Sequence, residues 1–180
     1  MFEYYEVIDR GSQLHAGDHV SWPTEVSAGR LQHHAIVVAQ KGRDWLKVIH
    51  VRTSEGASGK ALCSAMLGSD SAEDYVVAED TLDFGMTMQN GELRRYHYEP
   101  RHCREPFEVI KSAREKIGKF YYSALSNNCE HFARECKTGY KESYQADKAE
   151  EAAAWTGVAV AACAAVASSS FIAIRALIKK

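Results

Sequence analysis

HHAIVVAQKGRDWLKVIHVR, residues 33–52, is the stretch that decides the expected fold of this 180-residue chain. Its two halves, residues 33–40 and 45–52, are rich in β-branched residues, and the KGRD between them is typical of a turn. We therefore predict an antiparallel hairpin. Because alternate residues of a strand share a face, each histidine should lie with its neighbours two and four positions away. Those neighbours are Ala35 and Val37 for His33, and Leu46 and Val48 for His50.

Further strands and a helix are expected on either side of this hairpin. Residues 16–22 (AGDHVSW), 74–80 (DYVVAED) and 92–100 (ELRRYHYEP) have the composition of strands and their turns. Residues 106–118 (PFEVIKSAREKIG) begin with Pro, end with Gly and repeat apolar residues at helical spacing. Residues 53–73 are small and polar, which indicates a loop. Strands that precede helices predict an α+β fold with an antiparallel sheet packed against helices.

Composition excludes several classes of protein. The chain has 22 Lys and Arg against 24 Asp and Glu, and its basic residues form no stripe, so we expect no nucleic-acid partner. Five cysteines without a CxxC pair predict neither a disulfide framework nor a zinc site. We expect no metal and no cofactor. The acidic N-terminal residues do not resemble a secretory signal, which favours an intracellular protein.

The C-terminal region differs from the rest. Residues 152–174 contain no charge, and 23 residues of helix are long enough to cross a bilayer. Ten of the 23 are Ala and three are Ser, so the hydrophobicity is marginal. A helix packed on the domain or lying in the membrane interface is the alternative. We expect a catalytic domain over residues 1–148 and a membrane anchor over residues 152–174, with the domain on the cytosolic side.

NNCEHFARECKTG, residues 127–139, carries the candidate nucleophile. Asn127 and Asn128 are good N-cap residues and Gly139 is a good C-cap, which predicts a helix from about Cys129 to Thr138. Cys129 then lies in the first turn on the apolar face, where the helix dipole lowers a thiol pKa. The residues expected on that face are Cys129, Phe132, Ala133 and Cys136, with Glu130, Arg134 and Lys137 away from it. From spacing alone, a core cysteine and a nucleophile both remain open.

Two histidines on adjacent strands can activate such a thiol. His33 and His50 suit the roles of a base and a group that orients it, although each could equally be a core histidine. His34 follows His33 directly, and strand alternation lets only one of the two face the site. The remaining histidines of the first 130 residues are expected at the surface: His15, His19, His97 and His102.

The cysteine stretch resembles the NCEHF motif of the lecithin retinol acyltransferase family, which includes the HRAS-like suppressor phospholipases and acyltransferases. AGDHVSW and LQHHAIVV resemble that family's GD strand and H-x-A-I-x-V block, and KVIH takes the place of its second histidine. The resemblance implies Cys129 as nucleophile, His33 as general base and His50 as the orienting third member. It also implies a circularly permuted papain-like fold, distantly related to NlpC-type peptidases. His131 matches the motif, and we interpret it as structural.

The chemistry implied by the resemblance is acyl transfer from a glycerophospholipid through a thioester on Cys129. Water as acceptor gives phospholipase A1 or A2 activity, whereas an amine, a lysolipid or retinol gives acyltransferase activity. The expected partners are therefore a phospholipid donor, a lipid or water acceptor, and a membrane. Two alternatives remain: a papain-like thiol amidase or peptidase, and a non-enzymatic membrane-associated adaptor.

Overall fold

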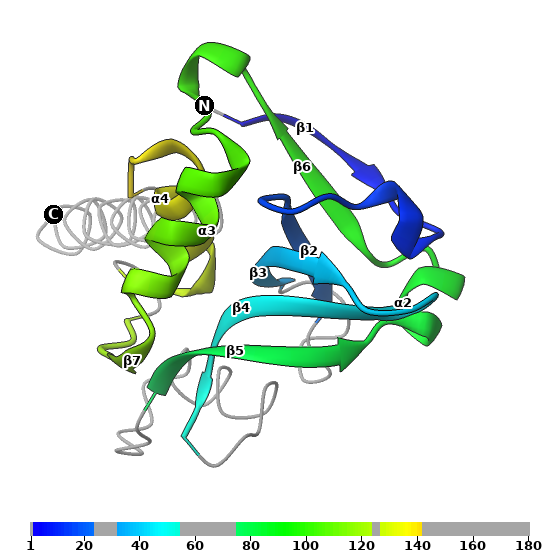
Figure 1. Ribbon diagram of the computed structural model, residues 1–180, viewed down its shortest axis with the longest axis horizontal. Coiled ribbons are helices and arrows are strands. Elements are labelled where there is room, and N and C mark those ends of the chain that lie inside the picture. The colour runs from blue at the N-terminus through cyan, green and yellow to red at the C-terminus, as the bar shows by residue number, and fades with distance from the viewer. Residues whose placement is uncertain (1, 24–31, 55–74, 124–126, 142–180) are drawn as a thin grey trace, which may run out of the picture. The chain divides into compact units, whose positions relative to one another are not determined.

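Seven antiparallel strands form one sheet in the computed structural model, in the order β1-β6-β2-β3-β4-β5-β7 (Figure 1). The structure describes residues 2–23, 32–54, 75–123 and 127–141. The strands are β1 (Phe2–Val7), β2 (His19–Pro23), β3 (Gln32–Gln40), β4 (Trp45–Thr53), β5 (Tyr75–Asp83), β6 (Arg94–Tyr98) and β7 (Gly118–Phe120). The α+β class and the antiparallel sheet are thus as predicted.

Helices accompany the sheet at several points of the chain. They are α2 (Gly85–Gln89), α3 (Pro106–Glu115) and α4 (Cys129–Thr138), with short 3₁₀ turns at Gly11–Gln13 and Pro100–His102. The predicted bounds of α4 are confirmed, and α3 begins at the predicted proline. Both helices lie together against one face of the sheet, where α4 contacts β2, β3 and β4 (Figure 1).

Each face of the sheet has its own apolar core. Beneath α3 and α4 the buried cluster includes Ile36, Ile49, Val77, Val109 and Phe132. The opposite face buries a second cluster that includes Ile8, Val20, Phe84, Met88 and Leu93. Because both faces of the central strands are covered, β3 and β4 contain long runs of buried residues rather than a simple alternation.

The hairpin of β3 and β4 sets the register for the site. Ala35 pairs with His50, and Ile36 pairs with Ile49. The second core contains Ala35, Val37, Leu46 and Val48, which are the residues predicted to share a face with the two histidines. A bulge between Val37 and Ala39 interrupts the pairing before the turn.

Strand β1 was not among the predicted elements. It pairs with β6, so that Tyr5 lies opposite Tyr96 and Val7 opposite Arg94. The partner strand is about ninety residues away in the sequence, and a local pattern carries no signal for such pairing.

The chain divides into one unit of residues Met1–Tyr144 and another of Gln145–Lys180. Of the loop predicted at residues 53–73, the structure describes Thr53, which is the last residue of β4, and Ser54, while the rest lies outside the described residues. The predicted anchor at residues 152–174 also lies outside them. Among the residues that are described, no helix has both the length and the apolar character needed to cross a membrane.

Candidate active site

Helix α4 begins in a fully formed cap that places Cys129 at its first position. The Asn128 side chain accepts hydrogen bonds from the backbone N–H groups of Glu130 (2.9 Å) and His131 (3.0 Å). In return, the His131 ring Nδ1 accepts the Asn128 backbone N–H at 3.3 Å. This reciprocal capping box explains the position of His131, which helps to fix the start of the helix on which the thiol sits.

The Cys129 thiol is buried and meets β3 at the position of His33. Its side chain is 5% exposed, and Sγ lies 3.9 Å from the carbonyl oxygen of Gln32. The backbone N–H of His34 also faces the sulfur. Because these two backbone groups flank His33 on either side, the thiol meets the strand at His33. Cys129 belongs to the apolar core beneath α4. The His33 side chain lies on the other face of β3, together with Ala35 and Val37 of the second core.

The electrostatics of the thiol differ from the expectation that a helix start lowers its pKa. Burial raises the pKa of Cys129 to about 12, although the backbone amides of His34, Cys129 and Glu130 act to lower it. Desolvation of the thiolate therefore outweighs the helix terminus. The resting side chain is a neutral thiol, and a base must remove its proton during the attack.

A hydrogen-bonded row of side chains runs from β3 across β4 to β5. His33 Nε2 lies 2.9 Å from His50 Nδ1, and His50 Nε2 lies 3.1 Å from Asp80 Oδ2. Both histidines are 1% exposed, and Trp22 packs edge-on against His33 with ring centroids 4.7 Å apart. We call the side chains of His33, His50 and Asp80 the carboxylate row. The structure thus brings the two predicted histidines into contact with each other and adds Asp80. It does not join Cys129 to the side chain of either histidine by a hydrogen bond: the thiol contacts the β3 backbone beside His33 instead.

The carboxylate at one end fixes the proton positions along this row. An ionised carboxylate only accepts, so His50 Nε2 carries a hydrogen and His50 Nδ1 accepts. His33 Nε2 must then be the donor, which leaves the lone pair on His33 Nδ1. Among the described residues, His33 Nδ1 is a buried ring nitrogen without a hydrogen-bond partner. This free acceptor has the properties required of a general base.

Burial keeps both histidines neutral. Burial, followed by the nearby His50 and His34, lowers the pKa of His33 well below its ordinary value. Burial also lowers the pKa of His50, against the opposing effect of Asp80. For Asp80, partial burial favours protonation, but hydrogen bonds from His50 and Arg52 lower its pKa overall. Neutral imidazoles next to an ionised carboxylate are therefore the resting state near pH 7.

A second row of polar side chains lies on the α4 face of the sheet and runs from β3 across β2 to β6. His34 Nδ1 is 2.8 Å from His19 Nε2, and His19 Nδ1 is 2.6 Å from the Tyr98 hydroxyl. We call His34, His19 and Tyr98 the phenol row. The prediction that His19 lies at the surface is wrong, because His19 is fully buried. Its strand is covered on both faces and paired along both edges, with β3 and β6.

The polar residues of α4 off the thiol face are also enclosed. Glu130 and Arg134 lie off that face, yet they are 4% and 6% exposed, and they pair with each other at 3.6 Å. Lys137 Nζ donates to the backbone carbonyl of Gly17 at 3.0 Å. The Lys137 hydrogen bond ties α4 to the turn that leads into β2, whereas the Glu130–Arg134 pair lies within the helix.

Sequence reasoning missed Asp80. The sequence DYVVAED did predict a strand, and strand alternation would have placed Asp80 on one face with Ala78 and Leu82. What was missing was the pairing register of β5 with β4, which sets Asp80 opposite Val48. Within the described residues, no group of three or more His, Cys, Asp or Glu side chains is arranged to hold a metal ion.

Comparison with known proteins places this geometry in a family. A family model described as lecithin retinol acyltransferase matches residues 12–142. This chain belongs to the lecithin retinol acyltransferase family. The match spans β2 to α4, and it includes Cys129, His33, His50 and Asp80. The resemblance inferred from the sequence motifs is confirmed.

One curated relative of this family member is a human protein named phospholipase A and acyltransferase 4. The two are 39% identical over 87 residues, which are 47% of this chain and 49% of the human protein. The aligned stretch thus covers about half the length of that relative. No solved structure gives a significant match to the chain.

Proposed function

We propose that this protein is a cysteine-dependent phospholipase A and acyltransferase that acts on glycerophospholipids through an acyl thioester on Cys129. Membership of the lecithin retinol acyltransferase family and the human relative's name both support acyl-transfer or phospholipase activity. The observation that carries the residue roles is the carboxylate row, which ends in an unpaired Nδ1 on His33. His33 is the residue at which the Cys129 thiol meets β3.

In the first half-reaction, His33 Nδ1 takes the proton of the Cys129 thiol as Sγ attacks the ester carbonyl carbon. The negative charge that develops on the carbonyl oxygen lies near the start of α4, where the positive end of the helix dipole stabilises it. The tetrahedral intermediate collapses and breaks the carbon–oxygen bond to the glycerol. His33 returns its proton to the departing alkoxide, which leaves as a lysophospholipid.

In the second half-reaction, an acceptor with an O–H or N–H group attacks the thioester carbonyl carbon. His33 Nδ1 removes the acceptor proton and returns it to the departing Cys129 sulfur. Water as acceptor releases a fatty acid, whereas a lipid amine or hydroxyl gives an acylated lipid. His50 holds the ring of His33 and disperses the positive charge that forms on it during both steps.

The thioester is tested by intact-protein mass spectrometry after incubation with phosphatidylcholine vesicles. We expect an acyl adduct that is released by hydroxylamine, maps to Cys129 and is absent from Cys129→Ser. Cys136→Ser is the matched control, because Cys136 is buried on the same helix and burial also raises its pKa to about 12. An adduct on Cys136, or a folded protein that yields neither adduct nor lysophospholipid, contradicts the proposal.

We further propose that the fold is the circularly permuted papain-like one, and that residues 152–174 keep the domain at the cytosolic side of a membrane. The family match supports the first proposal, and the uncharged run of residues supports the second. Deleting residues 151–180 tests the anchor: the shortened protein is expected to remain in the supernatant when membranes are sedimented. Continued sedimentation with membranes contradicts it.

A further inference from the structure

We propose that Asp80 is a positioning residue that sets the direction of the hydrogen bond between His50 and His33. The proposal rests on the function proposed above, in which His33 is the base. Asp80 lies on β5 opposite Val48, so it is the diagonal neighbour of His50 across the strand pair. Its Oδ2 is 3.1 Å from His50 Nε2.

The carboxylate is held from its other side by an arginine. Arg52 Nε donates to the same Oδ2 at 2.7 Å, and Arg52 Nη1 donates to the carbonyl oxygen of Thr53 at 2.8 Å. A guanidinium fixed in this way keeps Asp80 ionised and in place. Asp80 therefore accepts a hydrogen from His50 and cannot donate one.

The alternative proton arrangement shows why this matters. If His50 carried its hydrogen on Nδ1, that hydrogen would point at His33 Nε2, which would have to accept it. His33 would then carry its own hydrogen on Nδ1, and the lone pair needed to receive the Cys129 proton would be gone. Asp80 selects between these two arrangements without touching substrate or thiol.

The charged and titratable groups that the structure describes around His33 and His50 are few, so a change in the His33 tautomer can be assigned to Asp80. Facing His50 are His33 from β3, Arg52 from β4 and Asp80 from β5, and His33 also senses the charge of His34. The neighbouring carboxylate, Glu79, lies on the opposite face of β5, where it pairs with Lys47 (2.7 Å) and Arg114 (3.0 Å). Glu79 is thus a matched control: an ion-paired carboxylate one residue away that does not contact the carboxylate row.

The experiment compares wild type with Asp80→Ala, Asp80→Asn and Glu79→Ala in the full chain. Lysophospholipid release from phosphatidylcholine vesicles gives kcat, KM and the pH dependence of kcat/KM. Nitrogen-15 NMR of the histidine rings gives the tautomer of His33 without any substrate. Thermal unfolding shows which variants fold.

For Asp80→Ala we expect kcat to fall about 10- to 100-fold, with KM within about twofold of wild type. The partly exposed site admits water in place of the lost carboxylate, so the effect is smaller than in a fully buried triad. His33 and His50 share a hydrogen bond and therefore titrate as a pair, in which Asp80 raises the pKa of His50. Without Asp80 the acidic limb of kcat/KM should move to lower pH. Asp80→Asn keeps the shape of the side chain, but its amide can donate as well as accept, so kcat should fall as it does in Asp80→Ala. Glu79→Ala should match wild type.

An Asp80→Ala variant with wild-type kcat, or with the His33 hydrogen still on Nε2, overturns the proposal. If the alanine variant does not fold, Asp80→Asn decides: wild-type kcat with the His33 hydrogen still on Nε2 overturns the proposal, and a loss of kcat with that hydrogen moved to Nδ1 supports it. If wild type releases no lysophospholipid, the proposed function fails, while the tautomer comparison still decides the role of Asp80.

Discussion

The carboxylate row and the phenol row lie on opposite faces of the sheet and run from β3 in opposite directions, one over β4 and β5 and the other over β2 and β6. Both rows contain two buried histidines in ring-to-ring contact. The nitrogen–nitrogen distances are 2.9 Å for His33 and His50, and 2.8 Å for His34 and His19. The rows differ at their ends. One ends on the Asp80 carboxylate, whose side chain is 31% exposed, and the other ends on the buried Tyr98 hydroxyl.

This difference determines what each row can do. A carboxylate only accepts, so it gives its row one direction and leaves a lone pair on His33 Nδ1. A phenol can donate or accept, so Tyr98 imposes no direction on His19 and His34. Burial raises the pKa of Tyr98, so the hydroxyl stays neutral. Adjacent histidines in the sequence can therefore differ in role because of the group two side chains away.

The largest expected contrast is between His33→Gln and His34→Gln. Loss of a general base costs about 10³-fold in kcat/KM, and we expect that loss only for the His33 variant. The His34 variant should stay within about tenfold of wild type, because its row has no fixed direction. Lysophospholipid release measures both, and thermal unfolding controls for folding. Equal losses in the two variants would remove the functional distinction between the rows.

A smaller effect concerns stability in acid. Burial lowers the pKa of His34 from 6.5 to about 4, so between these values the unfolded chain binds a proton that the folded protein does not. Above pH 6.5 the burial of neutral His34 does not lower the free energy of unfolding. As the pH falls from 6.5 to 4, the free energy of unfolding decreases by about 3 kcal/mol on account of this residue. Urea unfolding from pH 7 to 4 should show this loss, and His34→Gln should reduce it. A flat profile would contradict the burial of neutral histidines.

The smallest expected effect comes from Tyr98→Phe, which removes the hydroxyl that contacts His19. A buried ring nitrogen loses its partner, so the free energy of unfolding should fall by about 1–2 kcal/mol. The rate of lysophospholipid release should stay within about twofold of wild type. Asp80→Ala is expected to show the reverse pattern, a large loss of kcat with less change in stability. A Tyr98→Phe variant that loses activity but not stability would place the phenol row in the chemistry.

The sequence was sufficient to predict the helices and strands whose ends are set by residues within one turn. Helix α4 runs from Cys129 to Thr138 as expected, because Asn128 and Gly139 are caps that act within one turn. Gly139 has a φ of 86°, the left-handed conformation that favours glycine, and its closing role was visible in the sequence. The hairpin of β3 and β4 was likewise predictable from a short turn between two β-branched runs.

Local sequence patterns did not predict the features that depend on contacts between segments far apart in the chain. The burial of His19 depends on β6 and Tyr98, which lie more than seventy residues further along the chain. Asp80 joins the site through the register of β5 against β4, which no tight turn specifies. The pKa of Cys129 was predicted from the helix terminus alone, whereas packing in the assembled core reverses the direction of the shift.

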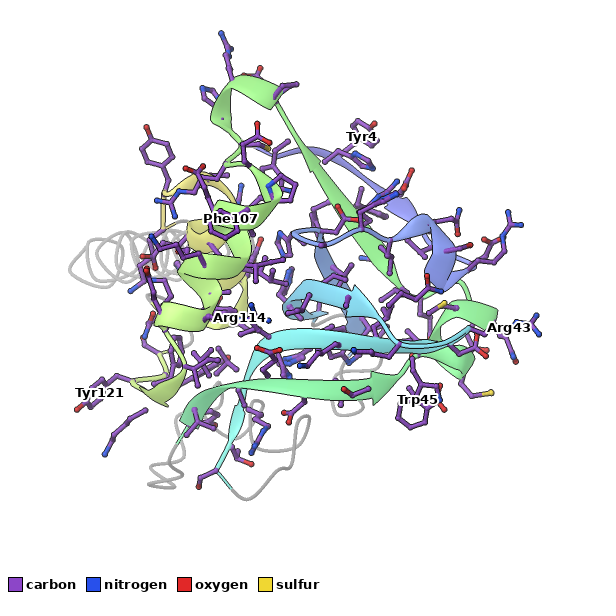
Figure 2. The ribbon with its side chains drawn as sticks, viewed as in Figure 1. Tyr4, Arg43, Trp45, Phe107, Arg114 and Tyr121 are labelled. Atoms are coloured by element: carbon purple, nitrogen blue, oxygen red, sulfur yellow. The ribbon has the colours of Figure 1, made fainter. Side chains whose placement is uncertain are left out.

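The bulge in β3 separates the site from the tip of its own hairpin. Ala35 pairs with His50 on the site side, and Gln40 pairs with Leu46 on the turn side, with the register shift between Val37 and Ala39. Figure 2 shows Arg43 and Trp45 at the tip, at the far end of the hairpin from α3. Because a bulge absorbs a change in strand length locally, the tip can gain or lose residues without moving His50 to the other face. The tip is therefore a place where family members can vary, and where a label or peptide can be inserted, at little risk to the proposed acyl transfer.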